Sequence, residues 1–115
     1  MQNQYYKLQR ISNYENSNEN TLSYIKSLIL QNYKVYDMLH NSGDLVPYHT
    51  HSHEETILIK KGRMRMIIEE NFIELQAGNI LTIEPWAIHL SCFPYKEGAD
   101  FYLCFPPKRK NFSSD

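Results

Sequence analysis

The chain has 115 residues, which is enough for one domain with one hydrophobic core. Hydrophobic residues make up 42% of the sequence and aromatic residues 13%, so the composition argues against a disordered chain. The formal net charge of -1 offers no basic surface, and we expect no nucleic-acid partner.

The sequence also bears on the compartment. It contains no run of about 18 apolar residues, so we expect no membrane partner. Its start, Met1 to Tyr6, lacks the apolar stretch of a secretory signal, which favours the cytoplasm. Thiols stay reduced there. We therefore interpret Cys92 and Cys104 as small buried hydrophobic residues, with a disulfide as the less favoured alternative.

The first part of the chain predicts a strand and a loop, followed by a segment whose secondary structure the pattern leaves open. Residues 5–11 are rich in Tyr and predict a strand, and residues 12–20 predict a polar loop. Residues 21–31 fit either a short amphipathic helix or the start of a long strand, and the pattern does not decide between them. The apolar residues at helical spacing are Leu22, Ile25, Leu28 and Ile29.

From residue 33 onward, short strand-like runs alternate with turn signals. The candidate strands are 33–40, 46–51, 55–60, 63–69, 71–76, 79–83, 88–93 and 99–105. Lys61-Gly62 is one of the breaks between them, and Pro106-Pro107 ends the last strand. With no helix between these strands, the pattern predicts an all-β antiparallel sandwich or barrel. We expect an N-terminal strand and loop extension at residues 1–32, packed on a barrel at residues 33–107. A polar C-terminal tail follows at residues 108–115.

A cluster of histidines carries the predicted chemistry. Three of the five histidines, His49, His51 and His53, lie within five positions. Residues i and i+2 of a strand face the same side, so His49 and His51 project together and can bind one metal ion. Glu55 follows four residues after His51, so the chain must bend between them if both are ligands. A bend places His53 at the loop tip in solvent, whereas a straight strand would make it the ligand in place of Glu55; we favour the bend.

The last ligand must come from a distant strand. His89 is the best candidate, because it follows a strand and a proline turn that returns the chain across the mouth of a barrel. Glu54 is the alternative carboxylate and ranks below Glu55, and His40 is interpreted as an ordinary surface strand end. The residues thus predict one divalent transition metal on His49, His51, Glu55 and His89.

These residues resemble the cupin superfamily over about residues 43–105. The first motif of that family, G-x5-H-x-H-x3,4-E-x6-G, is matched at Gly43, His49, His51, Glu55 and Gly62. The second motif, G-x5-P-x-G-x2-H-x3-N, is matched at Gly78 and His89. Its other positions hold Glu84, Trp86 and Phe93, although Pro85 lies next to the expected proline. Trp86 in place of a small residue implies a different backbone path or a partly covered mouth.

The resemblance implies a six- to eight-stranded jelly-roll barrel, often a homodimer, with Fe, Mn, Ni, Zn or Cu inside. It implies a small-molecule ligand or substrate, and the first hypothesis is a dioxygenase or a sugar or keto-acid isomerase. The same stretch also resembles the sensory cupin domains of AraC-type regulators without their DNA-binding part. The second hypothesis is therefore a non-catalytic binding domain, and the third is a metal that only stabilises the fold.

The residues identify no catalytic base. In residues 63–68, alternation predicts that Met64 and Met66 are buried and that Arg63 and Arg65 are exposed. A slip by one residue would bring Arg65 into the cavity as an anion site. The side chains expected to line the cavity are Tyr36, Tyr48, Ile57, Ile59, Met64, Met66, Trp86 and Tyr102.

Overall fold

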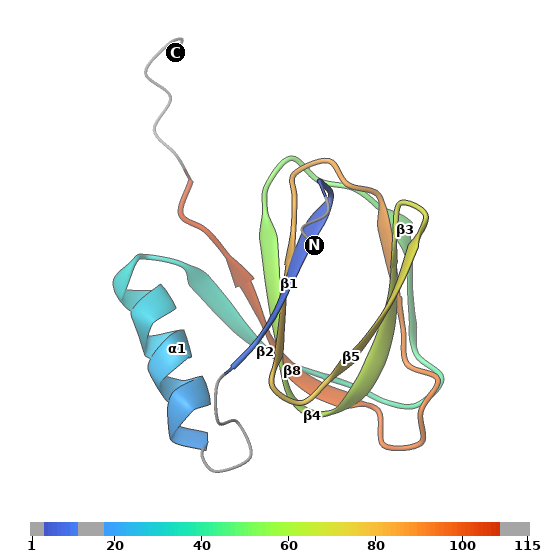
Figure 1. The fold of residues 1–115 in the computed structure, drawn as a ribbon, viewed down its shortest axis with the longest axis horizontal. Coiled ribbons are helices and arrows are strands. Elements are labelled where there is room, and N and C mark those ends of the chain that lie inside the picture. The colour runs from blue at the N-terminus through green and yellow to red at the C-terminus, as the bar shows by residue number, and fades with distance from the viewer. Residues whose placement is uncertain (1–3, 12–17, 109–115) are drawn as a thin grey trace, which may run out of the picture.

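The computed structural model describes residues 4–11 and 18–108. The strands of this part form a barrel, and one helix lies against its outside (Figure 1). The elements in chain order are β1 (Tyr6–Arg10), α1 (Asn18–Leu30), β2 (Lys34–His40), β3 (Leu45–His49), β4 (Glu55–Ile68), β5 (Asn71–Gln76), β6 (Asn79–Ile83), β7 (His89–Cys92) and β8 (Ala99–Phe105). The predicted all-β jelly-roll class, with one N-terminal helix, is confirmed.

Two antiparallel sheets build the barrel. The first sheet has the order β1-β6-β4-β8-β2, and the second has the order β5-β4-β7-β3. The first half of β4 belongs to one sheet and the second half belongs to the other, so this strand closes the barrel at one corner. The predicted N-terminal strand pairs along its whole length with β6 as an edge strand.

The corner in β4 lies where the sequence predicts a break. The register of β4 against β8 shifts between Ile59 and Lys61, and the interior side chains change from odd to even positions there. Gly62 has φ +80, and a Cβ at this position would lie 2.1 Å from the carbonyl oxygen of Gly98. Glycine is thus the one residue that fits. The expectation of two strands separated at Lys61-Gly62 is wrong, because glycine here serves a bulge within one strand.

The barrel interior is a packed hydrophobic core. It is formed by Ile57, Ile59, Met64, Met66, Ile68, Ile73, Leu75, Leu81, Ile83, Ala87, Phe93, Ala99 and Phe101. The predicted alternation in the second half of β4 is confirmed, since Met64 and Met66 are buried while Arg63 and Arg65 face outward. A core this complete leaves space for chemistry at an end of the barrel and not along its axis.

The open question over residues 21–31 is resolved as a helix. α1 packs Ile25 and Leu28 onto the outer face of the first sheet, against Leu58, Ile80 and Cys104. Leu22 and Ile29 of the expected apolar face are about half exposed, at 48% and 53%. The helix ends where Asn32 takes φ 68 and the Tyr33 N–H donates to the Leu28 carbonyl, a Schellman-type C-cap.

Both cysteines are free thiols in this fold. Cys104 is fully buried under α1, and burial raises the pKa of its thiol to about 12. Cys104 therefore serves as a small hydrophobic residue, as expected, while Cys92 is half-buried. No helix among the described residues is both long and apolar enough to cross a membrane.

Several expected boundaries differ slightly from those observed. The strands expected at 46–51 and 88–93 are shorter, because their ends belong to the loops that carry histidines. The polar loop expected at 12–20 falls mostly outside the described residues, but its last three residues begin α1. Most of the expected polar tail also lies outside the described residues.

Candidate metal centre

Four side chains from three strands and a loop meet at one end of the barrel. His49 ends β3, Glu55 begins β4, His89 begins β7, and His51 lies in the loop between the first two. One ligand atom from each residue lies within 4.8 Å of the others. The sequence identified this set of four, and the structure brings all of them together.

The local chain path explains how they meet. His49 is paired directly with His89 across β3 and β7, so a short antiparallel ladder places two imidazoles with ring centroids 4.3 Å apart. The chain then bends over residues 52–54, as predicted. This bend places His51 Nε2 2.7 Å from Glu55 Oε1.

A proline turn positions the distant ligand. The Ala87 N–H donates to the Glu84 carbonyl at 3.2 Å, closing a turn in which Pro85 and Trp86 are the central residues. Trp86 has φ 70, the conformation that glycine usually supplies at this turn position. Its N–H donates to the His51 carbonyl at 2.8 Å. The turn therefore fixes the loop of His51 against the strand of His89, and the Trp86 side chain stays 65% exposed.

Each imidazole is oriented by a backbone carbonyl. Nδ1 of His49 lies 2.9 Å from the Pro47 carbonyl oxygen. Nδ1 of His51 lies 3.0 Å from the carbonyl oxygen of His53, and Nδ1 of His89 lies 2.8 Å from that of Ala87. A carbonyl only accepts hydrogen bonds, so Nδ1 carries the proton in each ring. In His49 and His89, Nε2 is then left with its lone pair, and this is the tautomer in which a neutral histidine binds a metal. Nε2 of His51 faces the Glu55 carboxylate, which only accepts, so without a metal this nitrogen donates to Glu55, and a bound metal would take the place of that proton.

One of these nitrogens has no partner in the protein. His89 is 1% exposed, and its Nε2 forms no hydrogen bond among the described residues. Glu55 Oε1 is the facing charge at 3.5 Å, beyond the range of a good N–H···O bond. A buried polar atom without a partner costs about 1–3 kcal/mol. A metal ion at the centre would satisfy this atom, so the donor set fits a metal.

Electrostatics keeps the carboxylate charged. Burial would raise the pKa of Glu55, but the imidazoles of His89 and His51 outweigh burial and lower this pKa. Burial would lower the pKa of His89, but Glu55 and the Ala87 carbonyl outweigh burial and raise that pKa. Glu55 is therefore an anion at neutral pH and can bind a cation.

The two alternative ligands lie outside the centre. His53 is exposed at the loop tip, with its ring stacked on His51 at 4.3 Å. Glu54 faces a pocket on the other side of the loop. His40 differs from its prediction as a surface strand end. It is half-buried, its Nδ1 lies 3.0 Å from an Asp44 carboxylate oxygen, and its ring stacks on Phe93 at 4.5 Å.

The expected cavity lining needs correction. Four of the eight residues belong to the solid core, namely Ile57, Ile59, Met64 and Met66. Tyr36, Tyr48 and Trp86 are exposed, and Tyr102 lies on the outer face under Lys60. A pocket beside the loop of residues 52–54 is lined by none of the eight. Its residues come from four separate segments, so strand alternation carried no signal for it.

The arginine alternative is also decided by the fold. Arg65 faces outward and pairs with Glu74 and with the hydroxyl of Tyr95. Arg63 lies over the same Tyr95 ring at 3.9 Å. Both arginines therefore belong to a surface network and not to the metal centre.

The fold and the site agree with the family comparison. Residues 37–104 match the family described as the cupin domain. The chain therefore belongs to the cupin family. No curated protein matches the sequence.

Solved structures share the fold at low identity. An RmlC-like cupin from Shewanella frigidimarina has a TM-score of 0.60 and 20% identity, with 70% of each chain covered. The polyketide cyclase RemF from Streptomyces resistomycificus has a TM-score of 0.61 and 17% identity, with 69% of this chain and 57% of that chain covered. A salicylate 1,2-dioxygenase from Pseudaminobacter salicylatoxidans has a TM-score of 0.59 and 8% identity, with 64% and 21% covered. The chain thus spans less than two thirds of the two named enzymes.

Proposed function

We propose that this cupin binds one divalent transition metal through Nε2 of His49, His51 and His89 and a carboxylate oxygen of Glu55. The observation that carries the proposal is the buried, unpartnered Nε2 of His89 beside an anionic carboxylate. Mixed imidazole and carboxylate donors suit Fe, Mn, Ni, Zn or Cu better than Ca or Mg.

The proposed activity is catalysis on a small molecule, of the oxygenase or isomerase type. Four protein ligands leave one or two coordination positions open on such an ion, and a bound metal would polarise or activate an oxygen there. His49 is exposed, so the centre faces solvent at the mouth of the barrel. The similarity to the fold of a dioxygenase and a cyclase supports this class.

The protein residues have defined roles in this proposal. Glu55 supplies the negative charge, and the imidazoles of His51 and His89 hold that carboxylate in place. The carbonyls at Pro47, His53 and Ala87 accept from Nδ1, so Nε2 of each ring is the nitrogen that faces the centre. The buried core beneath the centre closes the barrel, so a substrate approaches from the open end.

A non-catalytic binding domain is the second candidate. The observation that favours it is the absence of a further histidine or carboxylate in the cluster, within the described part of the chain, to act as a general base. Turnover separates the two candidates. Binding of a small molecule without chemical change supports the second, and conversion of a bound molecule supports the first.

We also propose that the chain forms a homodimer through the outer face of its second sheet. Phe72, Ile67 and Leu90 are cross-strand neighbours on this face, and Phe72 is 73% exposed. Arg65 and Glu74 lie beside this row and pair with each other, so a second copy related by a two-fold axis would meet an apolar row beside charges that are already paired. The cytoplasmic location stays a prediction.

Metal content of purified protein tests the main proposal. We expect about one equivalent of a transition metal by elemental analysis, and its loss in His49→Ala and in His89→Ala. His53→Ala is the matched control, because this ring contacts His51 but lies outside the cluster. Full metal content in both ligand variants contradicts the site, and loss of metal in His53→Ala shows that the ligand set is different.

A further inference from the structure

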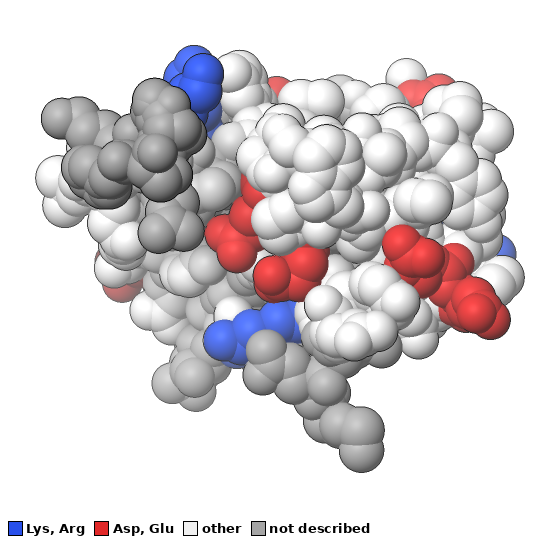
Figure 2. All heavy atoms as spheres, turned by 90° about the horizontal axis from the view of Figure 1, so that it is seen from above, with Lys and Arg blue, Asp and Glu red and all other residues white. Residues whose placement is uncertain are grey.

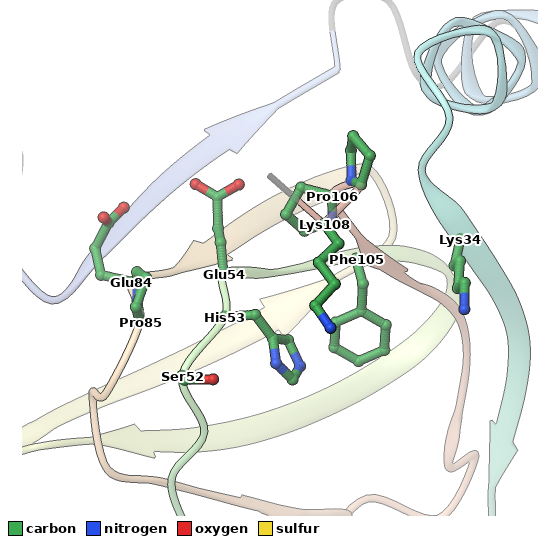
Figure 3. Close-up of a pocket in the computed structure, with 10 residues that line it drawn as sticks. Lys34, Ser52, His53, Glu54, Glu84, Pro85, Phe105, Pro106 and Lys108 are labelled. Carbon is green, nitrogen blue, oxygen red and sulfur yellow. The ribbon is translucent and has the colours of Figure 1, made fainter. Parts of the chain in front are cut away.

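A pocket of about 740 Å³ opens next to the candidate metal centre (Figure 3). Its size is typical of small-molecule sites. It is lined by Lys34, Ser52, His53, Glu54, Glu84, Pro85, Phe105, Pro106, Pro107 and Lys108. These residues come from the start of β2, the loop before β4, the turn after β6 and the end of β8.

The pocket has a flat, largely apolar floor. The rings of His53 and Phe105 meet edge to face with centroids 4.9 Å apart. The His53 ring is itself stacked on His51, with an angle of 7° between the two planes. One layer of ring therefore separates the pocket from a candidate metal ligand. A planar or apolar group on this floor would lie beside the centre.

The charges around the floor are divided by sign. Figure 3 shows Glu54 and Glu84 toward one side and Lys34 toward the opposite side, while the Lys108 side chain reaches between the rings of His53 and Phe105. In the view of Figure 2, acidic side chains near the middle of this face lie next to basic ones. Glu54 and Glu84 are close enough to repel each other electrostatically.

These four charges have no partners within residues 4–11 and 18–108. No ion pair and no side-chain hydrogen bond involves Lys34, Glu54, Glu84 or Lys108. Elsewhere on the surface, Lys60 and Arg63 do pair with acidic residues. The separated charges are thus free to meet a ligand that carries both signs.

We propose that this pocket binds a zwitterionic small molecule, with its cationic nitrogen toward Glu54 and Glu84 and its anionic group toward Lys34 and Lys108. The apolar body of the ligand covers the rings of His53 and Phe105. Amino acids with an apolar or aromatic side chain have this combination of groups. Binding in the pocket needs no metal, whereas the role of the ligand as a substrate rests on the proposed function.

Three probes of one size test the proposal on the full chain. They are L-phenylalanine, with both charges, phenethylamine, with the cation alone, and 3-phenylpropanoate, with the anion alone. Amide shifts followed by NMR during titration, in metal-free and metal-loaded protein, give each dissociation constant. We expect L-phenylalanine to bind about tenfold more tightly than either single-charge probe, with the shifts centred on the pocket residues.

Charge-neutral variants give the sharper result. In the double variant Glu54→Gln with Glu84→Gln, the affinity for L-phenylalanine and phenethylamine should fall about tenfold, and the affinity for 3-phenylpropanoate should not change. In Lys34→Gln with Lys108→Gln, the affinity for L-phenylalanine and 3-phenylpropanoate should fall about tenfold, and the affinity for phenethylamine should not change. The control is Lys61→Gln with Glu97→Gln, both exposed and outside the pocket. The proposal is overturned if all three probes bind equally well, or if up to about 10 mM L-phenylalanine shifts no amide of a pocket residue. It is also overturned if the preference for L-phenylalanine over the single-charge probes is lost in the control variant but kept in the two pocket variants. Binding that survives metal removal supports the pocket even if the metal proposal fails.

Discussion

At the scale of single residues, the candidate centre depends on where protons lie. Nδ1 of His49, His51 and His89 faces a backbone carbonyl, so Nε2 of each of these rings faces the centre. Glu55 and His89 face each other inside the protein, and this proximity lowers the pKa of Glu55 and raises that of His89. As pH rises, the stability that His89 adds to the metal-free protein should therefore fall, while the affinity for the metal should rise.

The first prediction concerns the stability of metal-free protein. The pKa of His89 is raised above its ordinary value of about 6.5, so its contribution to stability is present below that pH and is lost as pH rises through the folded pKa. The pKa of Glu55 is lowered, so its contribution is lost as the solution turns acidic. We expect the gap in Tm between metal-free wild type and His89→Asn to shrink between about pH 6 and pH 9. An unchanged gap would contradict the charge pair.

Metal affinity should change in the other direction. Ligation needs a neutral imidazole, so the affinity rises as pH rises through the pKa of His89. Competition with a chelator at several pH values measures this trend. The His53→Ala variant should follow the wild-type curve, because its ring is exposed and outside the cluster. An affinity independent of pH between about 5 and 8 would argue against imidazole ligands.

At the scale of elements, one turn and one strand corner hold residues at positive φ, and replacing these residues has a predictable cost in stability. The turn at residues 84–87 holds Trp86 at φ 70 and ties it to His51. Glycine adopts this φ at no steric cost, while alanine and tryptophan do not. We expect Trp86→Gly to unfold with a free energy about 1 kcal/mol greater than Trp86→Ala, with metal content unchanged in both. Chemical denaturation measures the difference, and the opposite order would contradict the turn geometry.

The corner of β4 gives a second prediction at this scale. In Gly62→Ala, the new methyl group overlaps the Gly98 carbonyl and the backbone keeps φ +80, so we expect a loss of about 3 kcal/mol. Gly43→Ala is the matched control, since Gly43 also has positive φ but nothing lies within 4 Å of a Cβ there. We expect a loss of about 1 kcal/mol in the control. Equal losses in thermal or chemical denaturation would show that the overlap is unimportant.

The same elements show what the sequence could predict. The spacing of His49, His51 and Glu55 was informative because strand geometry limits which side chains share a side, and the bend follows once Glu55 is a ligand. The Lys61-Gly62 corner was misread, because glycine at positive φ indicates a turn or a bulge equally well. Residues 21–31 fit a helix or a strand in the sequence, and packing of Ile25 and Leu28, with Tyr24, on the first sheet is what selects the helix.

At the scale of the whole molecule, the sequence predicted the barrel but not its pocket. Strand alternation is a local pattern, and it placed Met64 and Met66 in the core correctly. The pocket forms between chain segments that are more than 50 residues apart, such as Glu54 and Phe105. No local pattern records that proximity. Four of the eight residues predicted to line a cavity fill the core instead, and the other four lie at the outer surface.

The dimer prediction also belongs to the whole molecule. If the second sheet pairs with a second copy, Phe72→Asp buries a charge in that interface and should yield a monomer by analytical ultracentrifugation. Leu39→Asp is the control, because Leu39 is 70% exposed and lies on the other sheet. Wild-type protein that is monomeric at concentrations up to about 100 µM, or a Phe72→Asp variant that stays dimeric, would contradict this interface.

The proposed function rests on a single metal ion bound among four side chains. Anomalous diffraction from crystals, collected at the absorption edge of the metal found in the purified protein, tests it most directly. We expect one peak about 2.0–2.3 Å from Nε2 of His49, His51 and His89 and from an oxygen of Glu55. No peak there, or a peak at other side chains, would contradict the account.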